Sequence, residues 1–487
     1  MGQARDRIIQ NSFFQNDRAL LLTLWILVFT ERVIYTVWDK TGFLLIISDS
    51  VNYLQSGLDF AETGRILYNG YPTALIMPGI TVLIGLFAKI FTDKTVLNYA
   101  LRFAWILIGS FTPVFIYKSI RLYTRPWIAF VGSLIYLLPW FVEIDGYLLT
   151  ECPYYLFSAM AVFFMLRIGE GNAPKRTVWL FALSILGGLL FRANSLSIIA
   201  FSVIYWIIKG NMRIRELVTR LGIIGLVLAV FIVPWSLRNY KLFNTFIPIT
   251  YGASNPIFEG TYQGEGFPTD EELVAINDGF DAKKTVVEKY PEYFDNNGEV
   301  IQSEQKQFLD HMMMKELANY RLRKWFSLRP ASFLKSYLYI KPRQILNWVW
   351  YYIELFGISL QTAHRLRQIN FLLCVAAVIL SLTLKKHRKA VLFLCICYFI
   401  NLYMIAFSYA IDRYAQMIMP YRYILAAFCL ELFADVIEGK RYRKEESEGH
   451  RGTSQRKRIP FLTGDRENAI IKYSMIPQMR TGRRRLL

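Results

Sequence analysis

The chain has 487 residues, of which 54% are hydrophobic, 16% aromatic and only 19% charged, and its formal net charge is +19. This apolar content exceeds what the core of a soluble protein of this size needs, so the composition excludes an ordinary soluble enzyme and indicates an integral membrane protein. The excess of positive charge does not indicate a nucleic-acid partner. Residues 439–487 hold 14 Lys/Arg against 5 Asp/Glu, as is typical of a cytoplasmic tail near anionic lipid.

The first predicted elements set the orientation of the chain across the membrane. Residues 1–18 are polar and contain no Ala-x-Ala cleavage site, so the apolar run 19–38 is predicted to be a retained membrane span. Residues 39–97 then form a first external loop. Its apolar stretch 76–91 is predicted to be a helix lying at the outer surface, because counting it as a crossing would place every later basic gap outside.

Further apolar runs of near-spanning length follow, and the gaps between them are alternately basic. About 20 helical residues cross a hydrocarbon core of about 30 Å. The positive-inside rule assigns the basic gaps, and with them both termini, to the cytoplasm. Together with 19–38 the sequence predicts ten spans, the others being 98–117, 127–141, 152–166, 178–190, 196–208, 217–235, 371–384, 390–407 and 418–437.

A large external loop, 236–370, separates an N-terminal module of spans, 19–235, from the C-terminal spans, 371–437. Within it, residues 259–304 carry 12 acids and 3 bases, which is unlike a cytoplasmic loop. A helical pattern over 301–326 ends at Arg329-Pro330, and the aromatic stretch 346–360 is predicted to be an interfacial helix. The tail, 438–487, is predicted to be cytoplasmic.

Polar residues suited to chemistry begin in the first external loop, in SDSVNYLQSGLDFAETG. Asp49 can deprotonate an acceptor hydroxyl or hold a metal ion, and Tyr53 lies one helical turn away. The alternative is structural, because Asp is a favoured N-cap and the segment has the pattern of an amphipathic helix.

A second acid, Glu151 in LLTECPYYLF, begins the fourth span from the external side. The helix macrodipole favours an acid at this position, so a capping role is the alternative to a catalytic one. Two carboxylates at the outer ends of different spans can also converge across a cleft and divide base and electrostatic roles, as in many sugar-transferring sites. A divalent metal ion held by Asp49 and Glu151 stays open as a cofactor.

Four arginines depart from the positive-inside pattern because they lie at the external ends of spans: Arg102, Arg192 in FRANS, Arg238 in PWSLRNY, and Arg413 in IDRY. An arginine at the bilayer is costly unless it pairs with an acid or binds an anion such as a lipid phosphate. Snorkelling to the interface is the alternative. Asn239, beside Arg238, is a candidate for positioning substrate.

Several common chemistries find no support. The sequence contains no GxGxxG, Walker, HExxH, CxxC or GxSxG pattern, and the four histidines are scattered. The candidate acids also face away from the cytoplasm. A nucleotide-sugar donor is therefore disfavoured, and a lipid-borne donor is expected.

The same segments, in the same order, resemble the protein O-mannosyltransferase-like members of the GT-C glycosyltransferases. The matching segments are SDSVNYLQSGLDFAETGRILYNGYPTALIMPG, LLTECPYYLF, GGLLFRANSL, PWSLRNYKLFNTFIPI, RPASFLKSYLYIKPRQILNWVW and DRYAQMIMPYRYIL.

The resemblance implies an all-α, GT-C-like bundle with external juxtamembrane helices and one external loop element. It implies inverting or retaining transfer of a sugar from a polyprenyl-phosphate carrier to a glycan, lipid or protein acceptor, on the outer face of a bacterial plasma membrane. Asp49 would be the catalytic acid or base and Glu151 a second acid. The donor phosphate would be bound by Arg102, Arg192 and Arg238.

The sequence also departs from the family pattern. Only Asp49 stands where protein O-mannosyltransferases have an Asp-Glu pair, and the large external domains of those enzymes and of aminoarabinose transferases have no counterpart. Two other functions stay open: a transporter or flippase of lipid-linked sugars, and a polymerase or ligase of surface glycans. A transporter is expected to show two similar halves, and no repeat is evident.

Overall fold

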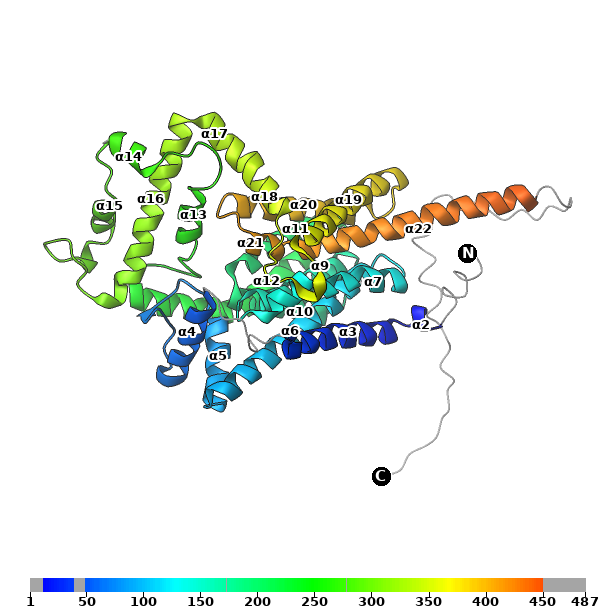
Figure 1. Cartoon of the computed structure of the whole chain (residues 1–487), viewed down its shortest axis with the longest axis horizontal. Helices are drawn as coiled ribbons and strands as arrows, with labels where there is room; N and C mark the ends of the chain where they lie inside the picture. Colours follow the sequence, from blue (N-terminus) through cyan, green and yellow to red (C-terminus); the bar gives the residue numbers. More distant parts are fainter. Residues whose placement is uncertain (1–11, 39–48, 172, 277, 450–487) are drawn as a thin grey trace, which may run out of the picture. The chain divides into compact units, whose positions relative to one another are not determined.

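The computed structural model describes residues 12–38, 49–171, 173–276 and 278–449 (Figure 1). Parts of three predicted segments lie outside the described residues: 1–11 of the N-terminal segment, 39–48 of the first external loop and 450–487 of the tail. The chain divides into two compact units, residues 1–434 and 435–487. The first unit holds the helical bundle and the candidate site.

Long apolar helices form the bundle. The bounds of its elements are α2 Ser12–Gln15, α3 Asp17–Trp38, α6 Lys94–Arg121, α7 Pro126–Ser133, α8 Pro139–Gly146, α9 Glu151–Gly169, α10 Lys175–Phe191, α11 Ser197–Lys209, α12 Ile214–Phe243, α19 Leu360–Leu384, α20 Arg388–Ala406 and α22 Met419–Gly449. Helix α6 begins at a side-chain cap: the Asp93 carboxylate accepts from the backbone N–H groups of Thr95 and Val96, both at 2.9 Å.

Six helices in the described part of the chain are long and apolar enough to cross a membrane: α3, α6, α9, α12, α19 and α20. A seventh span results if residues 126–137 and 139–146, which are bent by 57°, form one broken crossing. An all-α membrane bundle is therefore confirmed, whereas the predicted count of ten is not. The predicted spans 178–190 and 196–208 correspond to α10 and α11, whose 17 and 13 residues extend only about 25 and 20 Å.

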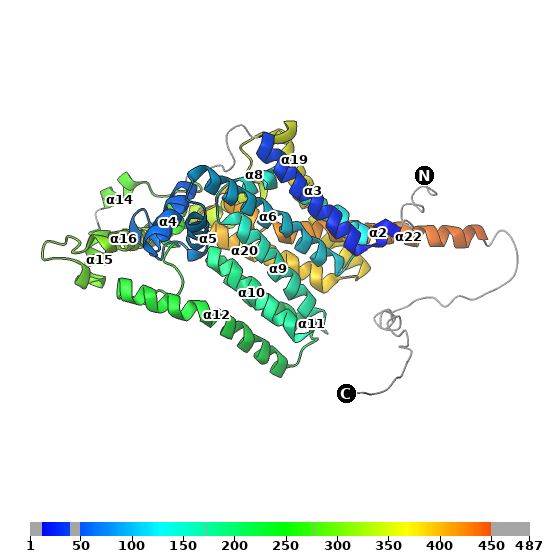
Figure 2. The same cartoon turned by 90° about the horizontal axis from the view of Figure 1, so that it is seen from below.

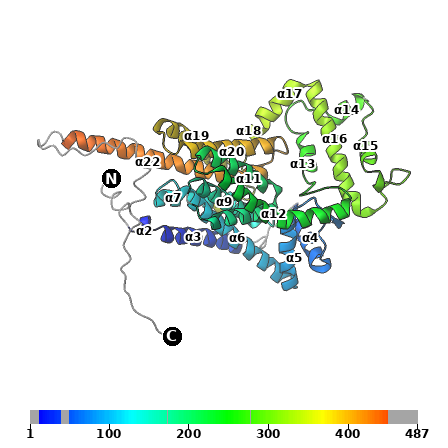
Figure 3. The ribbon, with the colours of Figure 1, turned by 180° about the vertical axis from the view of Figure 1, so that it is seen from behind.

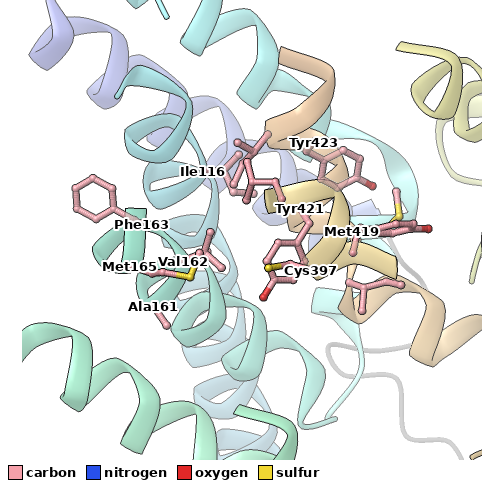
Figure 4. Close-up of a cluster of buried hydrophobic side chains, with 14 of the residues drawn as sticks. Ile116, Ala161, Val162, Phe163, Met165, Cys397, Met419, Tyr421 and Tyr423 are labelled. Atoms are coloured by element: carbon pink, nitrogen blue, oxygen red, sulfur yellow. The ribbon is translucent and has the colours of Figure 1, made fainter. Parts of the chain in front are cut away.

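Buried aromatic and aliphatic side chains hold the bundle together. Figure 4 shows part of this core, where Ile116 of α6, Phe163 and Met165 of α9, Cys397 of α20 and Tyr421 of α22 lie near one another. Helix α9 packs on α6, α10 and α11, and α10 also packs on α12 (Figure 2). This position makes α9, whose first residue is Glu151, the central helix of the bundle.

At one end of the bundle, α4 (Asp49–Thr63) packs on α5 (Pro78–Ile90). The chain between these two helices forms a hairpin of strands β1 (Leu67–Tyr68) and β2 (Tyr71–Pro72). Its turn is Asn69-Gly70 with φ values of 54° and 80°, as a type I′ turn requires. Helix α5 has 13 residues and is too short to cross a hydrocarbon core. Its position at the outer surface stays a prediction.

The loop after α12 forms a separate helical element (Figure 3). It comprises α13 Ser254–Gly260, α14 Asp270–Ile276, α15 Ala282–Lys289 and α16 Lys306–Leu328, followed by α17 Pro330–Lys335 and α18 Lys341–Asn347. The predicted helix over 301–326 is confirmed as α16, and Arg329 ends it as expected. Phe243, Tyr251 and Phe308 pack together and join this element to the end of α12.

The predicted interfacial helix over 346–360 is wrong. Helix α18 ends at Asn347, the backbone of Trp348 is extended, and an irregular loop with one 3-10 turn, Leu355–Gly357, continues to Ser359. A buried carboxylate replaces the helical hydrogen bonds: the N–H groups of Tyr352 and Ile353 donate to Glu143 of α8. The loop is therefore held by a residue about 200 positions earlier, which a local sequence pattern does not reveal.

Candidate active site

One predicted acid, Asp49, and one predicted arginine, Arg192, line a cavity of about 430 Å³. The second predicted acid, Glu151, is buried behind the cavity wall and contacts Arg192. The chain segments that form it are the start of α4, the α8–α9 and α10–α11 junctions, α13, α16 and the segment from α20 to α22. Its polar lining includes Asp49, Tyr53, Thr150, Arg192 and Arg413, with Asn194, Asn255, His311 and Asn401 further along the wall.

Asp49 is the first residue of α4, where the macrodipole favours an acid. Its Oδ2 lies 2.8 Å from Nη2 of Arg413, which belongs to α21 (Asp412–Met417). The Asp49 side chain is 31% exposed, and both residues line the cavity. The carboxylate is therefore accessible to a ligand while an arginine holds it in place.

Glu151 is the first residue of α9, and its side chain is only 1% exposed. Its Oε1 accepts from Arg192 Nη1 at 2.8 Å, and its Oε2 accepts from the Thr150 hydroxyl at 3.2 Å. Nε of Arg413 lies 3.2 Å from the same Oε1, without hydrogen-bond geometry, so this buried N–H has no acceptor among the described residues. Glu151 is thus an anchor shared by two arginines.

These contacts form an alternating chain: Asp49, Arg413, Glu151, Arg192. The aromatic ring of Tyr414 supports both guanidinium groups, whose central carbons lie 5.1 Å (Arg192) and 5.5 Å (Arg413) from its centroid. Such cation–π contacts favour the charged form and fix the plane of the guanidinium. Two arginines are therefore presented to one cavity with their orientation determined.

Electrostatics keeps the basic and phenolic groups of the site protonated. Burial acts to lower the pKa of Arg413, but the Coulombic attraction of Glu151 and Asp49 outweighs it and raises that pKa. Burial, followed by the charges of Asp49 and Glu151, raises the pKa of Tyr53 well above its usual value. Tyr53 therefore keeps its proton and can donate it in a hydrogen bond to a ligand.

The residues present do not fit the predicted divalent metal site. Both candidate ligands, Asp49 and Glu151, are already ion-paired with arginine. No group of three His, Cys, Asp or Glu side chains suited to a metal ion occurs in the part of the chain that the structure describes.

Three predicted site residues lie elsewhere. Arg102 donates to Thr36 Oγ1 at 3.0 Å and to the Gly146 carbonyl at 2.7 Å, so it holds the segment leading into Thr150 and Glu151. Arg238 donates to the carbonyls of Ile66 and Thr73 and does not line the cavity. Asn239 is fully buried and donates to the Ile247 carbonyl at 2.9 Å, which is a structural contact.

Arg413 and His311 also line the cavity and are not among the predicted site residues. The sequence indicates Arg413 only as an outer-face arginine, although its segment, IDRY, places an acid directly before it. His311 lies on α16, and its Nδ1 is 3.0 Å from the Ser254 hydroxyl. Nothing in the local sequence of His311 indicates that α16 folds back to the cavity.

Comparison with known proteins agrees with the resemblance predicted from the sequence. Residues 76–236 match the family model of the dolichyl-phosphate-mannose-protein mannosyltransferases. Among solved structures, the chain is similar to the archaeal oligosaccharyltransferase AglB from Archaeoglobus fulgidus in complex with an inhibitory peptide and a dolichol-phosphate. The TM-score is 0.51 and the sequence identity 13%, over 90% of this chain. The chain spans about half (52%) of the length of AglB. No curated protein sequence matches the chain.

Proposed function

From the premise that this chain is a membrane protein with the GT-C glycosyltransferase fold, we propose that it transfers a sugar from a polyprenyl-phosphate carrier to an acceptor hydroxyl at the outer face of the membrane. One observation carries the proposal: Arg192 and Arg413 line the same cavity as Asp49. This arrangement joins two anion-binding groups to a base in a space of ligand size.

The arginines supply the donor half of the reaction. When the bond between the sugar carbon C1 and the phosphate oxygen breaks, the electron pair stays on that oxygen and the phosphate gains negative charge. Planar guanidinium groups bind such oxygens in a bidentate manner and stabilise the charge. The Arg413 side chain is 18% exposed and lines the cavity, so its guanidinium is within reach of a phosphate oxygen there.

Asp49 supplies the acceptor half. A new bond forms between C1 and the acceptor oxygen, and the hydroxyl proton passes to the carboxylate of Asp49. A phosphate that binds Arg413 competes with Asp49 for the guanidinium. Donor binding therefore frees the Asp49 carboxylate to contact the acceptor hydroxyl.

Glu151 has a positioning role in this proposal. Its side chain is 1% exposed and contacts both arginines, so it holds them at the phosphate site and does not take the proton. The acceptor is a hydroxyl of a glycan, a lipid or a protein. A single displacement would invert the configuration at C1, and a double displacement would retain it.

The test is an assay of purified protein in nanodiscs with radiolabelled polyprenyl-phosphate and polyprenyl-diphosphate sugars. We expect the monophosphate donor to be consumed and free polyprenyl phosphate to be released, whereas Asp49→Asn leaves the donor intact. Movement of the labelled lipid between leaflets without consumption would instead support a transporter. Consumption of the diphosphate donor alone would indicate a polymerase or ligase.

A further inference from the structure

A second hollow lies away from the catalytic cavity, between α5, α10 and α12. It measures about 1030 Å³, and its walls are mostly apolar. The wall residues include Val82 of α5, Leu186 and Leu190 of α10, and Phe231 and Trp235 of α12. Helix α12 is a candidate membrane span, and its residues Val230 and Leu237 are 71% and 58% exposed. The groove therefore opens toward lipid.

Three cations also border this groove: Arg65, Arg238 and Lys241. Arg65 pairs with Glu304 at 3.1 Å. Arg238 is half-buried, and no carboxylate forms an ion pair with it among the described residues. A half-buried positive charge at the end of a membrane helix is costly without a counter-ion. The ring centroid of Trp235 lies 4.7 Å from the central carbon of the Arg238 guanidinium. The groove thus combines an apolar surface with a positive charge that an aromatic ring, but no carboxylate of the described residues, contacts.

The hydrogen bonds of Arg238 leave room for an anion. A guanidinium has five N–H donors. Nη1 of Arg238 donates to the Thr73 carbonyl and to Asn239 Oδ1, and Nη2 donates to the Ile66 carbonyl. The Nε–H and one Nη2 N–H have no acceptor in the described residues. Two donors of one planar group match two oxygens of a phosphate.

The groove does not communicate directly with the catalytic cavity. Met77 lines the cavity, whereas Pro78 lines the groove. Beside them α5 touches α10 closely: a Cβ atom added to Gly79 would lie 2.5 Å from the Leu190 carbonyl oxygen. A phosphate at Arg238 is therefore separated from Asp49 by packed backbone, so the groove is unsuited to a donor that must react.

We propose that this groove binds an anionic phospholipid of the surrounding membrane, with its phosphate on Arg238 and Lys241 and an acyl chain along α10 and α12. The cations match the headgroup, and the apolar walls match the chain. Lipid binding at this groove is a function separate from the proposed glycosyl transfer and does not depend on it.

A bound lipid would also stabilise the site end of the bundle. Arg238 holds the carbonyls of Ile66 and Thr73, on either side of the β1–β2 hairpin. Tyr68 of that hairpin lines the catalytic cavity. A ligand that fixes Arg238 therefore fixes this hairpin, and we expect it to raise the thermal unfolding temperature.

The test measures binding of phosphatidylglycerol and phosphatidylcholine to the full chain in detergent, by native mass spectrometry and by thermal unfolding. We expect phosphatidylglycerol to bind more tightly and to raise the unfolding temperature. Lys241→Gln should weaken phosphatidylglycerol binding about fivefold. Lys241 has no side-chain hydrogen bond or ion pair among the described residues, so this variant is expected to fold. Arg238→Gln should weaken binding further.

Arg213→Gln, at the opposite end of α12, is the matched control and should leave binding unchanged. Equal binding of the two lipids, or phosphatidylglycerol binding that persists in both Lys241→Gln and Arg238→Gln, would overturn the proposal. A competition experiment compares how well polyprenyl phosphate and unlabelled phosphatidylglycerol displace labelled phosphatidylglycerol. If polyprenyl phosphate is the better competitor, the groove belongs to the carrier, and the phospholipid proposal is overturned.

Discussion

The carboxylate of Asp49 lies 2.8 Å from the guanidinium of Arg413, so the first loop after α3 and the short helix before α22 share one ion pair. Both side chains are partly accessible, at 31% and 18%. The pair is strong enough to orient Asp49, yet it can open when a phosphate enters.

Asp49→Asn should abolish transfer and leave stability nearly unchanged. Asn still begins the helix but accepts no proton, and a partly exposed ion pair contributes less than about 1 kcal/mol. Turnover and unfolding temperature should be measured on the same preparation. Normal turnover in this variant would remove Asp49 from the mechanism.

Arg192→Lys and Arg413→Lys should each weaken donor binding. Lysine keeps the charge but loses the planar pair of donors, and a lost charged hydrogen bond corresponds to about 1.5 to 3 kcal/mol, or roughly 10- to 150-fold in affinity. Donor titration in nanodiscs measures the effect. Arg329→Lys, at an exposed pair with Glu272, is the control. If both site variants bind donor like the control, the phosphate lies elsewhere.

Glu151→Gln should be less stable than Asp49→Asn. Removing one partner of a buried pair leaves charge uncompensated and costs about 3 to 5 kcal/mol, and Glu151 compensates two arginines. Turnover should also fall, because the arginines lose their anchor. Parallel thermal scans of the two variants make the comparison. Equal stability of both would contradict the anchoring role.

Lys341 should make stability depend on pH. Its side chain is buried, and burial lowers the pKa to about 7. Between pH 7 and about 10 the folded chain binds fewer protons here than the unfolded chain does, so stability rises with pH across this window. Below pH 7 Lys341 is charged in both the folded and the unfolded chain. The free-energy cost of burying its charge then lowers the stability of the folded chain in full.

The comparison variant is Lys341→Met, which has no titrating group. Its unfolding temperature relative to the unmodified protein should fall as the pH is raised from 7 to 9. A pH-independent difference would mean that Lys341 stays charged in the folded state, held by the carbonyls of Gly260 and Ser408.

Lys284→Cys should be labelled by an impermeant thiol reagent in intact cells, because the loop after α12 is predicted to be external. Residue 284 is exposed on α15. Arg213→Cys, in a predicted cytoplasmic gap, should be protected until the membrane is opened. The reverse pattern would invert the orientation and place the cavity inside.

The sequence predicted the bundle and part of the site for identifiable reasons. Asp49 and Glu151 each begin a helix and Arg192 follows one, all at ends that the charge pattern predicts to be external, so parity and charge place them together. The same pattern predicts an external position for Arg238, but α12 continues to Phe243 and turns Arg238 toward the β1–β2 hairpin and the groove between α5, α10 and α12. Charge pattern gives the depth of a residue in the membrane and not the face of its helix.

The misassigned loop after α18 has a different cause. Trp348, Trp350 and Tyr352 suit an interfacial helix by composition, but Glu143 captures the backbone of Tyr352 and Ile353. A long-range contact that satisfies backbone N–H groups outweighs a local propensity. The same limit applies to His311, which reaches the cavity only because α16 packs against α13.

The alternating order of two acids and two arginines leaves these four side chains with no net charge. Such a cavity exerts little long-range attraction on anions dissolved in the surrounding water, so nucleotides and free phosphate are not concentrated there. A carrier confined to the bilayer does not need that attraction, because diffusion in two dimensions already brings it to the protein. Charge neutrality in the resting cavity would therefore act as a filter that favours membrane-borne over water-borne phosphates.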